Sequence, residues 1–340
     1  MYSLIRRKPA NTLLTGCLAA ALAVIGAGAY AQDDYTVPRT IDGYPDLQGV
    51  WANNTITPVE RPKVFADQAY LTEADIAFLR QRISEITEQD GDALFGDGAF
   101  AAAFSGDVQS FEPATGNYDQ AWLVERRIHN RTSQIIDPPD GRYPPRTEAG
   151  LATLTDIQQR LFGSPDSYTD RLLSERCISY GVPYLEPGYN SYWQIVQARD
   201  HVVIEQEMIH DTRIVKLVQR DELDQLDARI KMWNGDSRGY WDGDTLVIKT
   251  TNYADNEYEP KASAKTLTER LTRIADDQLR YQITIDDPGA FTAPYTREIM
   301  LDGTSDPIYE YACHEGNYGL YNILRGARAE EQRAAANEVD

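Results

Sequence analysis

Asp236-Ser-Arg-Gly-Tyr-Trp-Asp-Gly-Asp-Thr-Leu-Val-Ile-Lys-Thr-Thr-Asn-Tyr253 is the stretch that decides the fold, because it holds the clearest hairpin signal in the chain. Asp242-Gly243 predicts a two-residue type I′ turn, in which both central positions need positive φ and glycine adopts it without strain. Trp241 and Thr245 would then face each other across the turn. Residues 246–253 are rich in β-branched and aromatic side chains, as strands are. We therefore expect a β-hairpin at the centre of a sheet.

Segments with strand character continue on both sides of this hairpin. The clearest is 279–285, where apolar and polar residues alternate as in a half-buried antiparallel strand. The other expected strands are 191–197, 202–208, 213–218, 229–233, 267–274, 295–301 and 308–315. Short strands at this spacing, with no helices between them, favour an up-and-down barrel or a strongly curved meander.

Helices are expected only in the first half of the chain. Residues 71–87 have helical spacing of apolar side chains, and Thr72 with Asp75 resembles a capping box at the start. A second helix is predicted at 148–162, and a short third one at 168–174. The fold class is therefore α+β and mostly antiparallel β.

The chain divides into four expected regions. Residues 1–31 are a signal peptide, and residues 32–184 are an irregular and helical region that packs on the sheet, with Trp51 as an anchor. Residues 185–325 form the barrel-like domain, and residues 326–340 are a flexible tail without an apolar face.

The first 31 residues have the pattern of an export signal. Arg6, Arg7 and Lys8 precede an apolar stretch at 13–29, and Ala29-Tyr30-Ala31 has the pattern of a cleavage site. A lipid anchor at Cys17 is not expected, because the apolar run lies mostly after that cysteine. The stretch is also too short and too rich in Ala and Gly for a membrane span. We expect a periplasmic or extracellular protein.

The charge of the chain is strongly negative. The formal net charge is −20 at pH 7, and removal of a basic signal segment makes it more negative still. Nucleic acids and anionic membrane surfaces need a positive partner surface. The composition therefore predicts neither of these partners and favours a small-molecule or carbohydrate ligand.

Two cysteines, Cys177 and Cys313, follow the signal segment. In an exported protein such a pair predicts either one disulfide or two buried free thiols. A disulfide would connect the segment before the sheet to its last strand. Two cysteines without a second pair do not predict a zinc site.

One polar cluster surrounds His210. Glu205, Glu207, Asp211 and Arg213 crowd the same expected hairpin end, and a carboxylate beside an imidazole can carry out general acid–base chemistry. The alternative interpretation is a polar turn with a salt bridge.

A second candidate is His314 with Glu315, at the end of the last expected strand, where strand ends at a barrel mouth commonly carry sites. No cofactor is predicted. A divalent metal would require a fold that brings His210 and His314 together. Serine-hydrolase, phosphate-loop and dinucleotide-binding motifs are absent from the sequence.

Several stretches resemble a large family of exported bacterial proteins that are usually left as hypothetical. The matching residues are Pro45–Trp51, Arg131–Gly141, Glu207–Asp211, Gly235–Thr245 and Glu310–Asn317. No activity is established for that family, so the resemblance implies no catalytic residue. The C-terminal half is similar in pattern to lipocalin-like barrels, which is an analogy of fold alone.

Three functional hypotheses follow. The first is an enzyme that hydrolyses or eliminates from a carbohydrate or another small hydroxylated compound. Its proton-transfer groups would be His210 and His314, their partners Glu207 and Glu315, and its substrate-binding residues Asp211, Arg238, Trp241 and Tyr311. The second is a non-catalytic, lipocalin-like protein that binds a small apolar or aromatic ligand. A structural role in the envelope is a third. The enzyme hypothesis predicts that the histidine and glutamate side chains meet in one open pocket.

Overall fold

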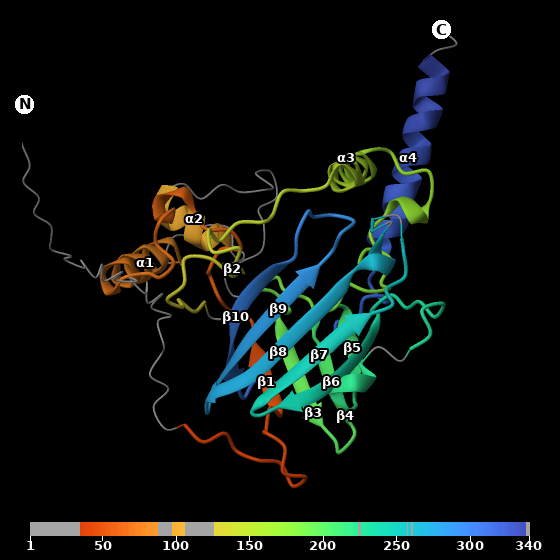
Figure 1. Cartoon of the computed structure of the whole chain (residues 1–340). Coiled ribbons are helices and arrows are strands. Elements are labelled where there is room, and N and C mark those ends of the chain that lie inside the picture. Colours follow the sequence, from red (N-terminus) through yellow and green to blue (C-terminus); the bar gives the residue numbers. More distant parts are fainter. Residues whose placement is uncertain are drawn as a thin grey trace, which may run out of the picture. The chain divides into compact units, whose positions relative to one another are not determined.

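The computed structural model describes residues 35–87, 97–105, 126–223, 226–256, 258–259 and 261–337. The expected signal peptide, with Cys17, lies outside these residues. The helices are α1 (Glu73–Thr87), α2 (Asp97–Ser105), α3 (Glu148–Phe162) and α4 (Tyr318–Asn337). The strands are β1 (Gly49–Ala52), β2 (Ile135–Asp137), β3 (Tyr192–Gln197), β4 (His201–Gln206), β5 (Asp211–Leu217), β6 (Asp236–Asp242), β7 (Thr245–Thr251), β8 (Thr266–Ala275), β9 (Gln278–Asp286) and β10 (Tyr295–Thr304) (Figure 1).

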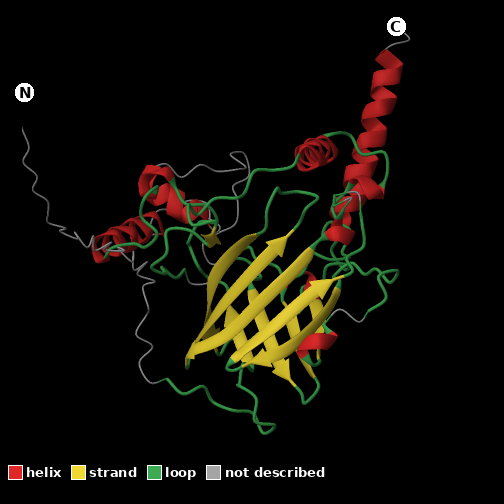
Figure 2. Cartoon of the chain, viewed as in Figure 1, coloured by secondary structure: helices red, strands yellow, loops and turns green. Residues whose placement is uncertain are grey.

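Nine strands close into a mixed β-barrel, which confirms the expected barrel-like fold (Figure 2). The order around the barrel is β1-β3-β4-β5-β6-β7-β8-β9-β10, and β10 pairs back onto β1. Strand β2 pairs with β10 at Thr296 and Arg297, beyond the residues of β10 that β1 uses. Closure leaves the barrel without a free edge along its wall.

The strand that closes the barrel comes from the N-terminal region. The sequence predicts only extended chain around Trp51, whereas β1 pairs with Gln194 of β3 on one side and Thr304 of β10 on the other, both through Val50. The barrel is therefore not confined to 185–325. A strand of four residues is too short for its alternation to be recognised in the sequence.

The up-and-down order is interrupted between β5 and β6. These strands are parallel, with Lys216 opposite Arg238, so residues 218–235 must cross from one end of the barrel to the other. The expected strand at 229–233 lies in this connection, and only Met232 makes a bridge there, to Tyr253. Apart from this pair, the neighbouring strands are antiparallel.

The central hairpin exists, but its turn lies one residue later than predicted. Asp242 pairs with Thr245, so Gly243 and Asp244 are the two central residues and Trp241 faces Leu246. Gly243 has a φ of +60° and Asp244 is not in the positive-φ region. A positive φ at the first central position only is the pattern of a type II′ turn, in which glycine takes that first position.

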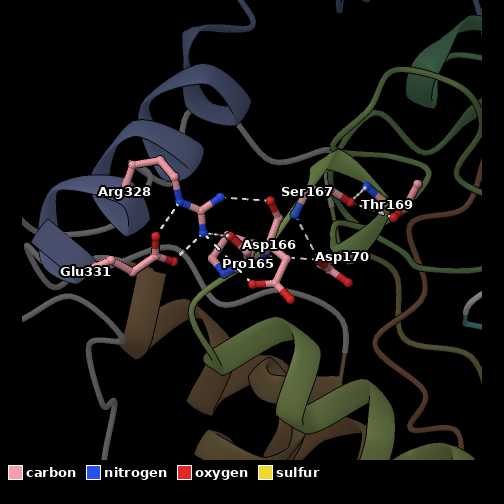
Figure 3. A network of polar contacts seen from close by, with 7 residues as sticks. All are labelled: Pro165, Asp166, Ser167, Thr169, Asp170, Arg328 and Glu331. Carbon is pink, nitrogen blue, oxygen red and sulfur yellow. Dashed lines mark hydrogen bonds and ion pairs between the residues drawn. The ribbon is translucent and has the colours of Figure 1, made fainter. Parts of the chain in front are cut away.

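The chain after β10 differs from the expectation. No strand forms at 308–315, and the sheet ends at Thr304. Residues 326–337, expected as a flexible tail, are the second half of α4. Arg328 of α4 pairs with Glu331 one turn later and donates hydrogen bonds to the carbonyl oxygens of Pro165 and Asp166 (Figure 3). Ala, Arg and Glu are good helix formers, which explains the helix without an apolar face.

The predicted helices α1 and α3 are confirmed. Thr72 and Asp75 form the expected capping box, in which Asp75 N–H donates to the Thr72 hydroxyl and Thr72 N–H to the Asp75 carboxylate. The short helix expected at 168–174 is reduced to one 3₁₀ turn, Tyr168–Asp170. Among the described helices none is long and apolar enough to cross a membrane.

The disulfide between Cys177 and Cys313 is present, with 5.7 Å between the two Cα atoms. It joins the segment before β3 to the segment after β10, because the expected last strand is missing. The bridge therefore connects two irregular segments rather than an irregular segment and the sheet.

The barrel interior is filled by the side chains of every second residue along the strands, which point inward. Leu279, Tyr281, Ile283 and Ile285 all point inward, as their alternation predicted. Trp193 contacts Tyr281 edge-to-face, with 5.1 Å between ring centroids. This packing gives the barrel a solid centre, so a ligand site must lie at an end rather than through the middle.

Candidate functional site: a pocket at the barrel mouth

A pocket of about 650 Å³ lies at the end of the barrel where β7 leads to β8 and β9 leads to β10. Its walls come from five parts of the chain: residues 143–157, which include most of α3, residues 172–185, Trp233, the β7–β8 connection and the β9–β10 connection. Leu267, Ile283 and Ile285 reach it from the inner faces of β8 and β9. The apolar side chains at this end of the barrel interior therefore form the floor of the pocket.

Three aromatic rings form one wall. Tyr143 stacks on Phe291, with centroids 5.5 Å apart and planes 16° apart, and Tyr295 meets both rings edge-on at 5.1 Å. The Arg146 guanidinium lies 4.7 Å from the Phe291 centroid. Rings that hold one another in this way make a rigid, apolar surface for a flat ligand.

Two tyrosine hydroxyls at the pocket are buried and make no hydrogen bond within the described residues. Tyr253 is 3% exposed and Tyr258 is 7% exposed. Burial raises the pKa of both phenols, and the Glu269 carboxylate raises that of Tyr253 further. Both therefore keep their protons at neutral pH. Solvent does not reach either hydroxyl oxygen, and Thr250 lies close enough to the Tyr253 hydroxyl to lower its pKa, so the two hydroxyls belong to the interior of the wall and do not donate into the pocket.

The charged side chains of the pocket are three basic ones and two acidic ones. Lys265 is paired with Glu259, at 2.8 Å from Nζ to Oε1, and its ammonium lies 4.5 Å from the Tyr253 centroid. The Asp287 carboxylate accepts hydrogen bonds from the backbone N–H groups of Gly289 and Ala290. Arg146 and Lys261 complete the set.

The wall at 172–185 is held by Asp211, one of the residues that the sequence analysis selected. Asp211 Oδ2 accepts from the Ser179 hydroxyl at 3.0 Å and the Tyr180 backbone N–H at 2.9 Å. Its Oδ1 accepts from Asn234, the neighbour of the pocket residue Trp233, at 3.2 Å. Asp211 itself does not line the pocket, so it positions two parts of the wall.

The other residues of the β4–β5 connection lie outside the pocket. His210 Nε2 is 3.3 Å from Glu205 Oε1, and the His210 side chain is 53% exposed. Ile209 and His210 both have positive φ, at 57° and 60°, which is uncommon for residues other than glycine. The connection is therefore a tight polar turn in which the His210 imidazole faces the Glu205 carboxylate.

Glu207 is the unusual residue of this turn. It is only 4% exposed; its Oε1 accepts from the Tyr309 backbone N–H at 3.4 Å, and its Oε2 has no hydrogen-bond partner among the described residues. Burial raises the pKa of Glu207, and the Tyr309 N–H and the Asn190 amide offset this only in part.

The second predicted pair is far more open. His314 and Glu315 are exposed, they follow Cys313, and neither lines the pocket. No hydrogen bond or ion pair connects His210 with His314 in the part of the chain that the structure describes. In the same part, no group of three or more His, Cys, Asp and Glu side chains is arranged to hold a metal ion.

Arg238, Trp241 and Tyr311 are also outside the pocket lining. Arg238 donates to Asp236 at 2.7 Å and to the Glu222 carbonyl at 3.4 Å, so its guanidinium is engaged locally. Trp241 stacks on Tyr44, with centroids 5.6 Å apart, near the β6–β7 turn at the opposite end of β7 from the pocket. Tyr311 lies close enough to Tyr180 to contribute to the raised pKa of that phenol.

A buried ion pair in the barrel interior was missed by the sequence analysis. Arg213 donates two hydrogen bonds to Glu269, at 2.5 and 2.7 Å, and Tyr281 donates a third at 2.9 Å. The Glu269 side chain is fully buried. Burial lowers the pKa of Arg213, but the Glu269 charge outweighs it and raises that pKa. The available signal was a charged residue at an inward position of an alternating strand.

The chain matches no protein-family model and no curated protein. The resemblance to exported bacterial proteins stays a prediction.

Proposed function

We propose that this protein is an exported, non-catalytic binding protein for a small ring-containing organic ligand, which it holds in the barrel-mouth pocket. The observation that carries the proposal is the wall of three mutually packed rings, Tyr143, Phe291 and Tyr295, in a pocket of about 650 Å³.

The shape and lining of the pocket support binding of a flat, partly apolar molecule. A volume of about 650 Å³ lies within the range of small-molecule sites. The wall of Tyr143, Phe291 and Tyr295 is apolar and rigid, and Arg146 and Lys261 are among the few polar side chains of the lining. Mostly apolar walls with few convergent polar groups are typical of ligand sites.

The positions of the predicted acid–base residues favour binding over catalysis. None of His210, Glu207, His314 and Glu315 lines the pocket. General acid–base catalysis needs the proton-transfer group within hydrogen-bond reach of the substrate, directly or through one water. A ligand in the pocket would not meet these groups.

Export is part of the proposal. The disulfide between Cys177 and Cys313 is typical of proteins in oxidising compartments. The basic and apolar first 31 residues support the same compartment. Mass spectrometry of the protein purified from the cell envelope would test it, and a mature chain that begins at Gln32 is the expected result.

A thermal-unfolding screen tests the binding function. The probes are glucose, glucuronate, benzoate and 2-naphthoate, each at millimolar concentration. We expect at least one ring-containing probe to raise the unfolding temperature, because a ligand that binds only the native state stabilises it. If none of the four does so, the proposal is contradicted.

Two variants locate the binding. Phe291→Leu replaces one ring of the aromatic wall with an aliphatic side chain, so we expect it to reduce the shift caused by the ligand. Tyr281→Phe is the matched control inside the barrel: it removes a hydroxyl that is bonded to Glu269. That change should lower the unfolding temperature of the free protein by an amount corresponding to about 1 kcal/mol.

Acid–base chemistry at Glu207 is the second candidate, favoured by its raised pKa and its unpartnered Oε2. A hydrolase or lyase of this kind would lose its activity in Glu207→Gln. A screen of the wild-type protein against chromogenic glycosides, with the variant as the control, would test it.

A further inference from the structure

We infer that the barrel-mouth pocket selects organic anions, and that Arg146 and Lys261 bind the negative group. This inference rests on the proposed binding function, and it adds the chemical class of the ligand. It begins from a contrast in charge: the whole chain has a formal net charge of −20, whereas the pocket lining is positive by one, with three basic and two acidic side chains.

Arg146 and Lys261 border the same short loop, Gly289–Phe291. Arg146 lies over the Phe291 ring and forms a bridge with the Phe291 backbone. Lys261 packs against Gly289 so closely that a Cβ added to that glycine would lie 2.8 Å from the Lys261 Cβ. The two cations, one from the N-terminal side of α3 and one from the β7–β8 connection, are therefore brought to one side of the pocket.

Neither of these cations is neutralised within the described residues. Among the described residues, no carboxylate lies within ion-pair distance of Arg146 or Lys261, whereas the third cation, Lys265, is paired with Glu259. The other carboxylate of the lining, that of Asp287, accepts from the backbone of its own turn. A negative potential from the rest of the chain repels an anion at long range, so selection must come from these nearby charges.

The aromatic wall and the two cations fit the same ligand class. A carboxylate accepts several hydrogen bonds, and those from Arg and Lys N–H groups are charge-assisted. An aromatic wall beside two unpaired cations matches a ring that carries a carboxylate.

A matched pair of probes tests the inference: 2-naphthoate and 2-naphthamide, which share the ring and differ in charge. Binding of each to the full chain would be measured by isothermal titration calorimetry. We expect 2-naphthoate to bind roughly tenfold more tightly than the amide, which corresponds to about 1.4 kcal/mol. Raising the salt from about 0.05 M to about 0.5 M should narrow the difference, because salt screens exposed charges.

Two variants connect the preference to the cations. Arg146→Gln and Lys261→Gln should each weaken 2-naphthoate binding several-fold and leave 2-naphthamide binding unchanged. Lys63→Gln is the control, because Lys63 is exposed and does not line the pocket. Lys261 is also exposed, so its variant keeps the test intact if Arg146→Gln fails to fold.

The outcomes separate the two proposals. If both probes bind equally, or the amide binds better, the anion inference is overturned and the binding function stands. If the acid binds better but neither variant reduces its affinity, the assignment to Arg146 and Lys261 is overturned. If neither probe binds, the anion inference is overturned for such rings, and the binding function falls with it only if glucose, glucuronate and benzoate also fail in the thermal screen.

Discussion

The β4–β5 connection and the barrel-mouth pocket differ in how their polar residues are brought together. In the connection, Glu205, Glu207, His210 and Asp211 are close because they are neighbours in the sequence. Glu205 and His210 contact each other, and Asp211 holds the wall at 172–185. In the pocket, Tyr143, Tyr253 and Phe291 come from segments far apart in the chain. A dense run of titratable residues was thus a poor guide to the pocket, because a turn at a strand end is polar whether or not it binds anything.

The two regions also differ in the burial of their charged pairs. The Arg213–Glu269 pair below the pocket is buried and bidentate, whereas the His210–Glu205 pair is half exposed. Buried and exposed pairs differ in what their loss costs, since an uncompensated buried charge is far more expensive than an exposed one. Four changes put these differences to the test.

The largest expected effect is that of Glu269→Ala. It leaves the Arg213 guanidinium and the Tyr281 hydroxyl without their partner inside the barrel, so we expect the free energy of unfolding to fall by about 3–5 kcal/mol. Glu205→Ala, which removes the partner of His210, should cost less than about 1 kcal/mol. Urea denaturation of both variants measures the difference, and equal costs would mean that the interior pair is not the stronger structural element.

Removing the disulfide should have the next largest effect. Cys177→Ser with Cys313→Ser releases a closed loop with a sequence separation of 136, and losses of about 2–4 kcal/mol are typical. Because Cys177 lies within the wall at 172–185, we also expect weaker binding of 2-naphthoate. An unchanged affinity in the folded double variant would show that the wall is held by other contacts.

Asp211→Ala tests the link between the turn and the pocket. The change leaves the Ser179 hydroxyl, the Tyr180 N–H and the Asn234 amide without their acceptor, at a cost of about 1–3 kcal/mol. Ligand affinity should fall with it. His210→Gln, one residue away, is the control and should change neither the stability by more than about 1 kcal/mol nor the affinity; a comparable loss in both would argue for a site in the turn itself.

Glu207→Gln should have the smallest effect, and one that depends on pH. Burial raises the pKa of Glu207 in the folded protein above its value in the unfolded chain, 4.5. The folded state therefore binds the proton more tightly, and the stability from this group is complete below pH 4.5 and decreases as the pH rises through the folded pKa.

Glutamine has no charge to bury, so the variant should unfold at a higher temperature than the wild type at pH 7. The gain should shrink towards pH 4. Thermal unfolding across this range measures it, with the exposed Glu315→Gln as the control. A loss of stability at pH 7 would mean that the hydrogen bonds from the Tyr309 N–H and the Asn190 amide outweigh the cost of burying the Glu207 carboxylate.

Much of the local structure was predictable. The alternation at 279–285 placed Leu279, Tyr281, Ile283 and Ile285 on one inward face, and Thr72 with Asp75 marked the start of α1. A disulfide and two buried free thiols were the alternatives for Cys177 and Cys313, and the structure contains the disulfide. The predicted turn was misplaced by one residue, because Asp-Gly and Gly-Asp both suit two-residue turns and the pairing of the whole strands decides between them.

The sequence by itself determined the features that depend on near neighbours: strand alternation, a helix cap, a hairpin and a polar turn around His210. Each follows from backbone geometry and side-chain contacts over a few residues. Only the tertiary structure decided that β1 closes the barrel, that Asp211 supports a pocket wall, and that Tyr253, Tyr258, Arg146 and Lys261 share one pocket. These depend on which distant segments bury their surfaces together, and no short-range pattern in the chain records that choice.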